Sequence, residues 1–162
     1  NIIEVDCDRI VGVEIVLENI ALGKVTSQSS YYATGVNSSR AVDGNLKTRF
    51  YDNSCIHTAT RRPFTWWQVD LGSEFYIHKL AIYFRTQNTG RRNGVEVYSS
   101  VDVNQTNTGH LCGTATLDSP DVTRMTCNNT ARYITLYRNT YNKDTADRAM
   151  DFCEVQVFGK LD

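Results

Sequence analysis

The chain of 162 residues has the length of one ordinary domain, long enough to bury a hydrophobic core of its own. Its 17 lysines and arginines are balanced by 18 acidic residues, and the formal net charge is -1. No basic stripe is present, which argues against nucleic acid or an anionic membrane as partner, and the apolar stretches are far shorter than the roughly 20 residues of a membrane-spanning helix.

The predicted elements are almost all strands. Residues 11–17 alternate apolar and polar side chains, which predicts a strand in a segment too charged to be a signal peptide. Further runs rich in β-branched and aromatic residues predict strands at 66–71, 75–85, 94–99, 132–138 and 153–158. Short helical turns are expected only at 38–42 and 142–149. This pattern favours an all-β sandwich or jelly roll over a parallel α/β sheet.

Five cysteines stand at positions 7, 55, 112, 127 and 153 without a CxxC pair, which argues against a zinc-finger or thioredoxin-type site. Three N-x-S/T acceptors occur at Asn37, Asn104 and Asn128 in turn-like contexts. Together they favour a secreted, disulfide-bonded glycoprotein. Cys7 lies in a segment that looks appended, so we take it as the unpaired cysteine, free or bridged to another part of a multidomain or oligomeric protein.

Seven segments carry a resemblance to a known family, in that family's order. They are NIALGKVTSQSS from Asn19, AVDGN at 41–45, SCIHT at 54–58, WWQVDLG at 66–72, IHKLAIYFR at 77–85, RRNGVEVY at 91–98 and DFCEVQVFG at 151–159. They resemble the F-type lectins, or fucolectins. The resemblance implies a discoidin-like jelly-roll β-sandwich that binds L-fucose without catalysis and holds a structural calcium ion. It divides the chain into an N-terminal extension or linker, 1–18, and a lectin-like domain, 19–162.

The family's sugar motif is a histidine, then downstream an arginine, any residue, an aspartate, four residues, and an arginine or lysine. His57, Arg85 and Arg92 match the histidine and the two basic positions of this motif. Guanidinium groups offer fixed forks of donors to sugar hydroxyls, and an imidazole donates or accepts according to its tautomer. Without the family, a lone histidine in a polar loop is more often a solvated residue, and an arginine at a strand end usually lies along the sandwich edge.

Aromatic surface is expected to pack against the C–H face of the sugar. Tyr51 resembles a family position with this role, and Tyr32 is a second candidate. Gln87 stands where the motif has aspartate, and Asn88-Thr89 replace two cysteines of some members. Glutamine keeps an acceptor but loses the charge that would neutralise the arginines. We therefore expect weaker binding or a preference for an acidic or sulfated glycan.

The resemblance also implies a calcium site and two disulfides. Calcium takes roughly six to eight hard oxygen ligands, many of them main-chain carbonyls. The matching positions are Arg40, Asp43, Asn45, Ser54, Cys153 and Glu154. Asp-Gly-Asn alone is simply a good turn sequence. The implied role of the ion is to hold the loop that carries His57, and the implied disulfides are Cys55–Cys153 and Cys112–Cys127.

Two other functions compete with that of a lectin. An enzyme is not favoured, because no nucleophile elbow, HExxH motif or phosphate loop is present and no pair of carboxylates is singled out for glycoside hydrolysis. The alternative is a discoidin-like module that binds protein or lipid, with a lapsed sugar site. The expected partners are fucosylated or acidic glycans on cell surfaces or glycoproteins, and useful avidity would need several copies of the site.

Overall fold

The computed structural model describes residues 17–161. Over this range it contains strands joined by loops and three short 3-10 helices, and every strand pairing is antiparallel. The strands are β1 (Glu18–Asn19), β2 (Val25–Gln28), β3 (Ile56–His57), β4 (Thr65–Phe84), β5 (Glu96–Ser100), β6 (His110–Thr114), β7 (Val122–Arg138) and β8 (Asp151–Leu161). The helices are η1 (Ser38–Val42), η2 (Phe50–Asp52) and η3 (Thr89–Arg92). The all-β prediction is confirmed.

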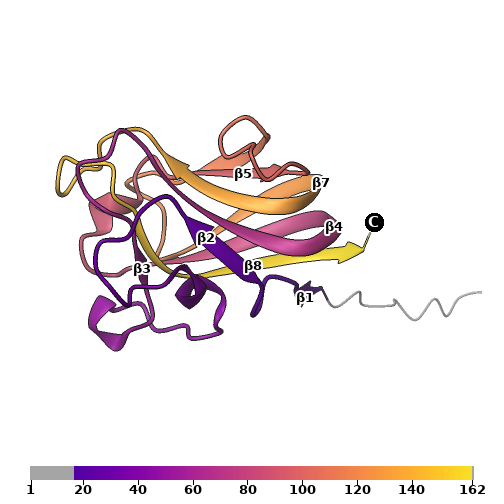
Figure 1. Ribbon diagram of the computed structural model, residues 1–162, viewed down its shortest axis with the longest axis horizontal. Helices are drawn as coiled ribbons and strands as arrows, with labels where there is room; N and C mark the ends of the chain where they lie inside the picture. The colour runs from indigo at the N-terminus through magenta and orange to yellow at the C-terminus, as the bar shows by residue number, and fades with distance from the viewer. Residues whose placement is uncertain (1–16, 162) are drawn as a thin grey trace, which may run out of the picture.

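Two long strands organise the sandwich. The strands follow the order β1-β8-β4-β7-β5-β6, with β2 on β4 and β3 on β8. The first part of β4 pairs with β2 and with the end of β7, whereas its second part pairs with β8 and with the start of β7. Because β4 and β7 change partners along their length, they curve and join both layers of a jelly-roll sandwich (Figure 1).

The register shift in β4 explains a difference from the sequence prediction. Two strands were expected, at 66–71 and 75–85, but one strand runs through both and its pairing with β7 shifts between Asp70 and Phe75. Gly72 has a φ of 87° at this point, a conformation that glycine adopts without steric cost. A bend within β4 therefore stands where a turn between two strands was expected.

The core fixes the position of η1. Trp67 is fully buried and its ring meets Phe152 edge to face, with 5.4 Å between the ring centroids. Its indole Nε1 donates a hydrogen bond of 2.9 Å to the carbonyl of Ser38 in η1. The loop that follows η1 is thus anchored to the centre of the sandwich, while Trp66, its neighbour in β4, stays half-buried.

The short helical turn expected at 38–42 is confirmed as η1. The turn expected at 142–149 is wrong, because the buried side chain of Asn142 accepts from the amides of Asp144 and Thr145 and donates to Asp147, bonds that compete with a helix. Both disulfides, Cys55–Cys153 and Cys112–Cys127, are confirmed.

Cys7 and almost all of the strand expected at 11–17 lie outside the described residues, and the domain boundary at residue 19 stays a prediction. No helix in the described range is long and apolar enough to cross a membrane. The loops around η1, η2 and η3 gather at the end of the sandwich away from the C-terminus (Figure 1).

Candidate functional site

A small pocket lies among these gathered loops. Its volume is about 200 Å³, below the roughly 300–1,000 Å³ of pockets for drug-sized ligands, so it suits a group of monosaccharide size. Its lining comes from the loop after β2, from η2, from β3 and from the loop between β4 and β5. The lining residues are Tyr32, Phe50, Tyr51, His57, Arg85, Asn88 and Arg91. We call this cavity the His57 pocket.

A buried carboxylate holds the two arginines of the pocket. Asp151 has a side chain only 2% exposed, and its Oδ2 accepts from Arg91 Nη1 at 2.7 Å and from Arg85 Nη1 at 3.0 Å. Asp151 lies at the start of β8, directly opposite His57 of β3. Gln87 adds a neutral contact, because its Oε1 accepts from Arg85 Nε at 3.3 Å. The negative charge absent from position 87 is therefore supplied by Asp151.

His57 is held as a neutral ring with one tautomer. Its Nδ1 lies 2.6 Å from the carbonyl of Thr58, which only accepts, so Nδ1 carries the proton. Its Nε2 lies 2.7 Å from Arg91 Nη1, which only donates, so Nε2 accepts. Burial is the main cause that lowers the pKa of His57 below its usual value. A sugar hydroxyl that bonds Nε2 must therefore replace the Arg91 donor.

Arg92, predicted as a sugar contact, does not line the His57 pocket. Its Nη2 donates to Asp121 Oδ1 at 2.7 Å and its Nη1 to the carbonyl of Ser119 at 2.7 Å, which turns the side chain toward the loop before β7. Neighbouring residues of a 3-10 helix point about 120° apart, so in η3 only one of two adjacent arginines faces the pocket. Arg91 takes that place, six residues after Arg85.

A buried arginine, Arg138, also holds the main chain of Arg91 in place. The guanidinium of Arg138, fully buried at the end of β7, donates through Nη1 to the carbonyl of Arg91 and to that of Ala149 at 3.3 Å. Burial lowers the pKa of Arg138 to about 10, so it remains charged at neutral pH. This contact links η3, which supplies Arg91, to the loop that leads directly into Asp151 at the start of β8.

Aromatic rings form the walls of the pocket. The ring of Tyr32 lies 4.4 Å from that of His57, and Phe50 meets His57 edge to face at 5.7 Å. The guanidinium of Arg85 lies 4.8 Å from the ring centre of Phe50. Tyr51 is exposed at the rim. Within the described residues, Arg85 donates through Nε and Nη1 and Arg91 through Nη1, so Nη2 of each keeps donors for a ligand between apolar walls.

The residues of the implied calcium site fit a cation. Glu154 is fully buried, its Oε1 accepts from the amide of Gly44 at 3.1 Å, and its Oε2 has no hydrogen-bond partner. Burial raises the pKa of Glu154 to about 8, with Asp43 nearby adding to the rise. A buried carboxylate oxygen without a donor is costly, and a calcium ion would satisfy it.

The other implied ligands would offer oxygen in different ways. Ser54 is buried beside Cys55, and its hydroxyl donates to the carbonyl of Arg49. Arg40 and Cys153 have only main-chain carbonyls to offer, because a guanidinium does not bind cations and the sulfur of Cys153 is in a disulfide. Asn45 follows the Asp43 turn, where its amide donates to Asp43 Oδ1 at 2.9 Å.

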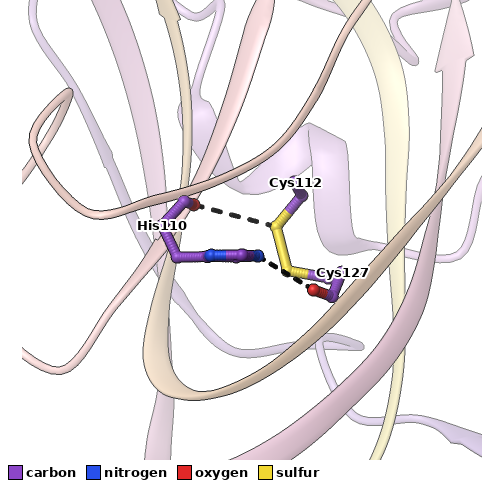
Figure 2. Close-up of side chains that lie close together, drawn as sticks. All are labelled: His110, Cys112 and Cys127. Atoms are coloured by element: carbon purple, nitrogen blue, oxygen red, sulfur yellow. Dashed lines mark hydrogen bonds between the residues drawn. A yellow bond between two sulfur atoms is a disulfide. The ribbon is translucent and has the colours of Figure 1, made fainter.

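A second cluster has the residue types of a metal site but not the chemistry. His110, Cys112 and Cys127 lie together between β6 and β7 (Figure 2). The two sulfurs are bonded to each other, so neither is a thiolate that could bind a metal. The His110 Nε2 is 3.0 Å from the carbonyl of Cys127, which makes it a structural contact.

The glycosylation acceptors Asn37, Asn104 and Asn128 are all exposed.

Comparison with known proteins places this geometry in a family. The family model of NedA-like, galactose-binding domains matches residues 40–136. Fucolectin-4 of Anguilla japonica is 28% identical over 149 residues, which cover 86% of this chain and 79% of the relative. The pentraxin fusion protein of Xenopus laevis is 33% identical over 49% of this chain, but the match spans only 19% of that protein.

Solved structures of F-type lectins and related modules have a similar fold. The serum F-lectin of striped bass, Morone saxatilis, superimposes with a TM-score of 0.77 at 27% identity, covering 90% of this chain and 48% of the bass chain. A fucose-binding module of Streptococcus pneumoniae gives a TM-score of 0.72 at 30% identity over 88% of this chain and 95% of the module. The fold is that of the discoidin-like jelly rolls. The chain belongs to the family of NedA-like, galactose-binding domains, and within it to the F-type lectins.

Proposed function

We propose that this domain is a non-catalytic lectin that binds L-fucose, or a glycan ending in fucose, in the His57 pocket. The observation that supports it most is the pair of guanidinium groups, Arg85 and Arg91, held on one buried carboxylate between aromatic walls. This arrangement offers fixed donors to sugar hydroxyls and an apolar surface to the methyl group that fucose has in place of a hydroxymethyl group. The F-lectin relatives and the fucose-binding module support the same ligand.

In this proposal each residue has its own task. Arg85 and Arg91 donate to sugar hydroxyls through Nη2, while Asp151 and His57 hold the two guanidinium groups in place. Tyr51, Tyr32 and Phe50 pack against the C–H face. The charges of Arg85, Arg91 and Asp151 sum to +1 with His57 neutral. Because Asp151 supplies the counter-charge, a neutral fucoside is sufficient for this pocket.

The test is calorimetric titration with L-fucose of the wild-type domain, Arg91→Ala and Arg92→Ala. We expect Arg91→Ala to abolish measurable binding and Arg92→Ala to keep it, provided that circular dichroism shows both variants folded. Loss in Arg92→Ala with retention in Arg91→Ala would contradict the assignment. A folded wild-type domain that binds neither fucose nor fucosylated glycans on an array would favour the discoidin-like protein- or lipid-binding alternative. Turnover of a nitrophenyl fucoside would contradict the non-catalytic role.

The calcium ion and the location of the protein belong to the same proposal. We propose that calcium binds Glu154 and the Asp43 loop as a structural ion, a proposal supported by the unsatisfied Oε2 of Glu154. We also propose a secreted, glycosylated protein, which two disulfides and three exposed acceptor asparagines support. Mass spectrometry of the native protein before and after glycosidase treatment tests the glycosylation.

A further inference from the structure

We infer that a second site, a groove rich in arginine beside the His57 pocket, binds the anionic group of an acidic saccharide. The groove has a volume of about 320 Å³ and is formed by the loop before β4 and the loop between β7 and β8. Its lining residues are Arg61, Arg62, Pro63, Tyr141, Ala146, Asp147 and Arg148. We call it the arginine groove. It shares no lining residue with the His57 pocket.

The arginines of this groove lack carboxylate partners. Arg61 and Arg62 are exposed and make no hydrogen bond or ion pair within the described residues, and Arg148 makes no ion pair there either. Elsewhere Arg85 and Arg91 pair with Asp151, Arg92 pairs with Asp121, and Arg132 pairs with Asp70. Three unpaired guanidinium groups around one groove are therefore unlike the other arginine clusters of this chain.

The one acidic residue of the groove is directed into its own loop. Asp147 Oδ1 accepts from the amide of Ala149 at 2.7 Å and from Asn142 Nδ2 at 3.0 Å, and no ion pair joins Asp147 to the described arginines. The charges of the three arginines and Asp147 sum to +2. An anionic ligand would find donors there that no protein group has already taken.

Arg148 is preorganised within the arginine groove. The guanidinium of Arg148 lies 4.1 Å from the ring centre of Tyr141, and its Nε donates to the carbonyl of Asn139 at 2.8 Å. Both contacts fix the plane of the group and leave its terminal nitrogens for a ligand. Arg61 and Ala146 have φ values of 57° and 49°, a left-handed conformation that non-glycine residues rarely adopt.

The ligand class follows from the charge and the neighbourhood. Guanidinium forks match the oxygens of a sulfate ester or a carboxylate, and the ring of Tyr141 offers a face for a sugar. His57 of β3 and Asp151 of β8 face each other. Arg61 follows His57 by four residues, and Arg148 precedes Asp151 by three. The Cα atoms of His57 and Arg61 are at most about 14 Å apart. The arginine groove therefore lies close to the His57 pocket.

This inference extends the proposed lectin function, and the test separates the two sites. Galactose 6-sulfate, N-acetylneuraminic acid and uncharged galactose are titrated into the intact domain in low salt and followed by calorimetry. We expect one or both acids to bind and galactose not to bind. The Arg61→Gln/Arg62→Gln variant should bind the acidic sugar about tenfold or more weakly, since hydrogen bonds to charged groups contribute most to affinity. Added salt should also lower the affinity for the acidic sugar.

Matched variants decide where the acid binds. Arg124→Gln/Lys160→Gln also removes two positive charges, but from exposed positions outside the groove, and should leave the affinity for the acidic sugar unchanged. Arg61→Gln/Arg62→Gln should bind L-fucose like the wild type, whereas Arg91→Ala should lose fucose and keep the acid. Absence of acid binding by the wild-type domain, equal binding by the groove variant, or loss of acid binding in Arg91→Ala would each overturn the inference. None of these results depends on whether the His57 pocket binds fucose.

Discussion

Replacing Asp151 by asparagine should weaken both stability and sugar binding. Asparagine keeps the shape of the side chain and one acceptor oxygen, but it leaves the guanidinium groups of Arg85 and Arg91, at 3.0 and 2.7 Å, without their shared charge. Removing one partner of a buried ion pair costs about 3–5 kcal/mol, and the retained acceptor favours the lower end. We expect about 3 kcal/mol, or a fall in melting temperature of about 6–12 °C.

The sugar affinity should fall about tenfold to a hundredfold in Asp151→Asn, because both arginines lose the orientation on which their donors depend. The assay is thermal unfolding by differential scanning calorimetry, together with fucose titration below the melting temperature of the variant. Asp121→Asn is the matched control. Asp121 pairs with Arg92 at 2.7 Å but its side chain is 58% exposed, so its loss should cost less than about 1 kcal/mol.

A second substitution sharpens this prediction. Gln87→Asp introduces a carboxylate beside Arg85, whose Nε now donates to Gln87 Oε1 at 3.3 Å. In the Asp151→Asn background it should recover part of the lost affinity, whereas in the wild type it adds a second carboxylate and little benefit. The two substitutions should therefore be non-additive. If Asp151→Asn melts and binds like the wild type, or if Asp121→Asn has the larger effect, the assignment of Asp151 as the charge partner of the pocket is refuted.

Calcium removal and pH give two further predictions. EDTA should lower the melting temperature of the wild type but not that of Glu154→Gln, which no longer needs a cation beside its Oε2 position; an unchanged wild-type melting temperature would contradict a structural ion. Fucose affinity should be constant from about pH 8 down to below 6.5 and fall in more acid solution, because burial lowers the pKa of His57 and its protonation removes the acceptor for Arg91. The unfolded chain takes up that proton at its ordinary pKa of about 6.5, so the stability due to neutral His57 should decline as the pH falls below this value. Loss of binding already at neutral pH would show that another group controls it.

The long strands and β5 could be predicted from the sequence, but β2, β3 and β6 could not. The first part of β4 and the end of β7 alternate apolar and polar residues over enough positions to indicate a strand. By contrast, β2 and β3 have four and two residues, too few for a period to show, and β6 has the length of β5 but contains a glycine and only one β-branched residue. The first half of β7 is rich in threonine and asparagine, and it is a strand because β4 pairs with it.

The site was only partly accessible from the sequence. The family pattern indicated His57, Arg85, Tyr32 and Tyr51, and the structure brings these four together. It also indicated Arg92, since a seven-residue spacing says nothing about which way η3 turns its two arginines. A local signal for Arg91 did exist, because it directly precedes Arg92, but choosing between them needed the helix geometry.

Asp151 gave no signal as a site residue, although it begins the segment DFCEVQVFG that resembles the family. It is 66 positions from Arg85, and its role depends on β8 starting there and on Asp151 facing His57 across β3. Electrostatics requires a negative charge near two converging guanidinium groups but does not require a particular loop to carry it. A motif defined along the chain therefore registers Gln87 as a defect, whereas in space Asp151 supplies the carboxylate that position 87 lacks. Arg61, Arg62 and Arg148 of the arginine groove have no carboxylate partner within the described residues, which is why we place the preference for acidic saccharides there and not in the His57 pocket.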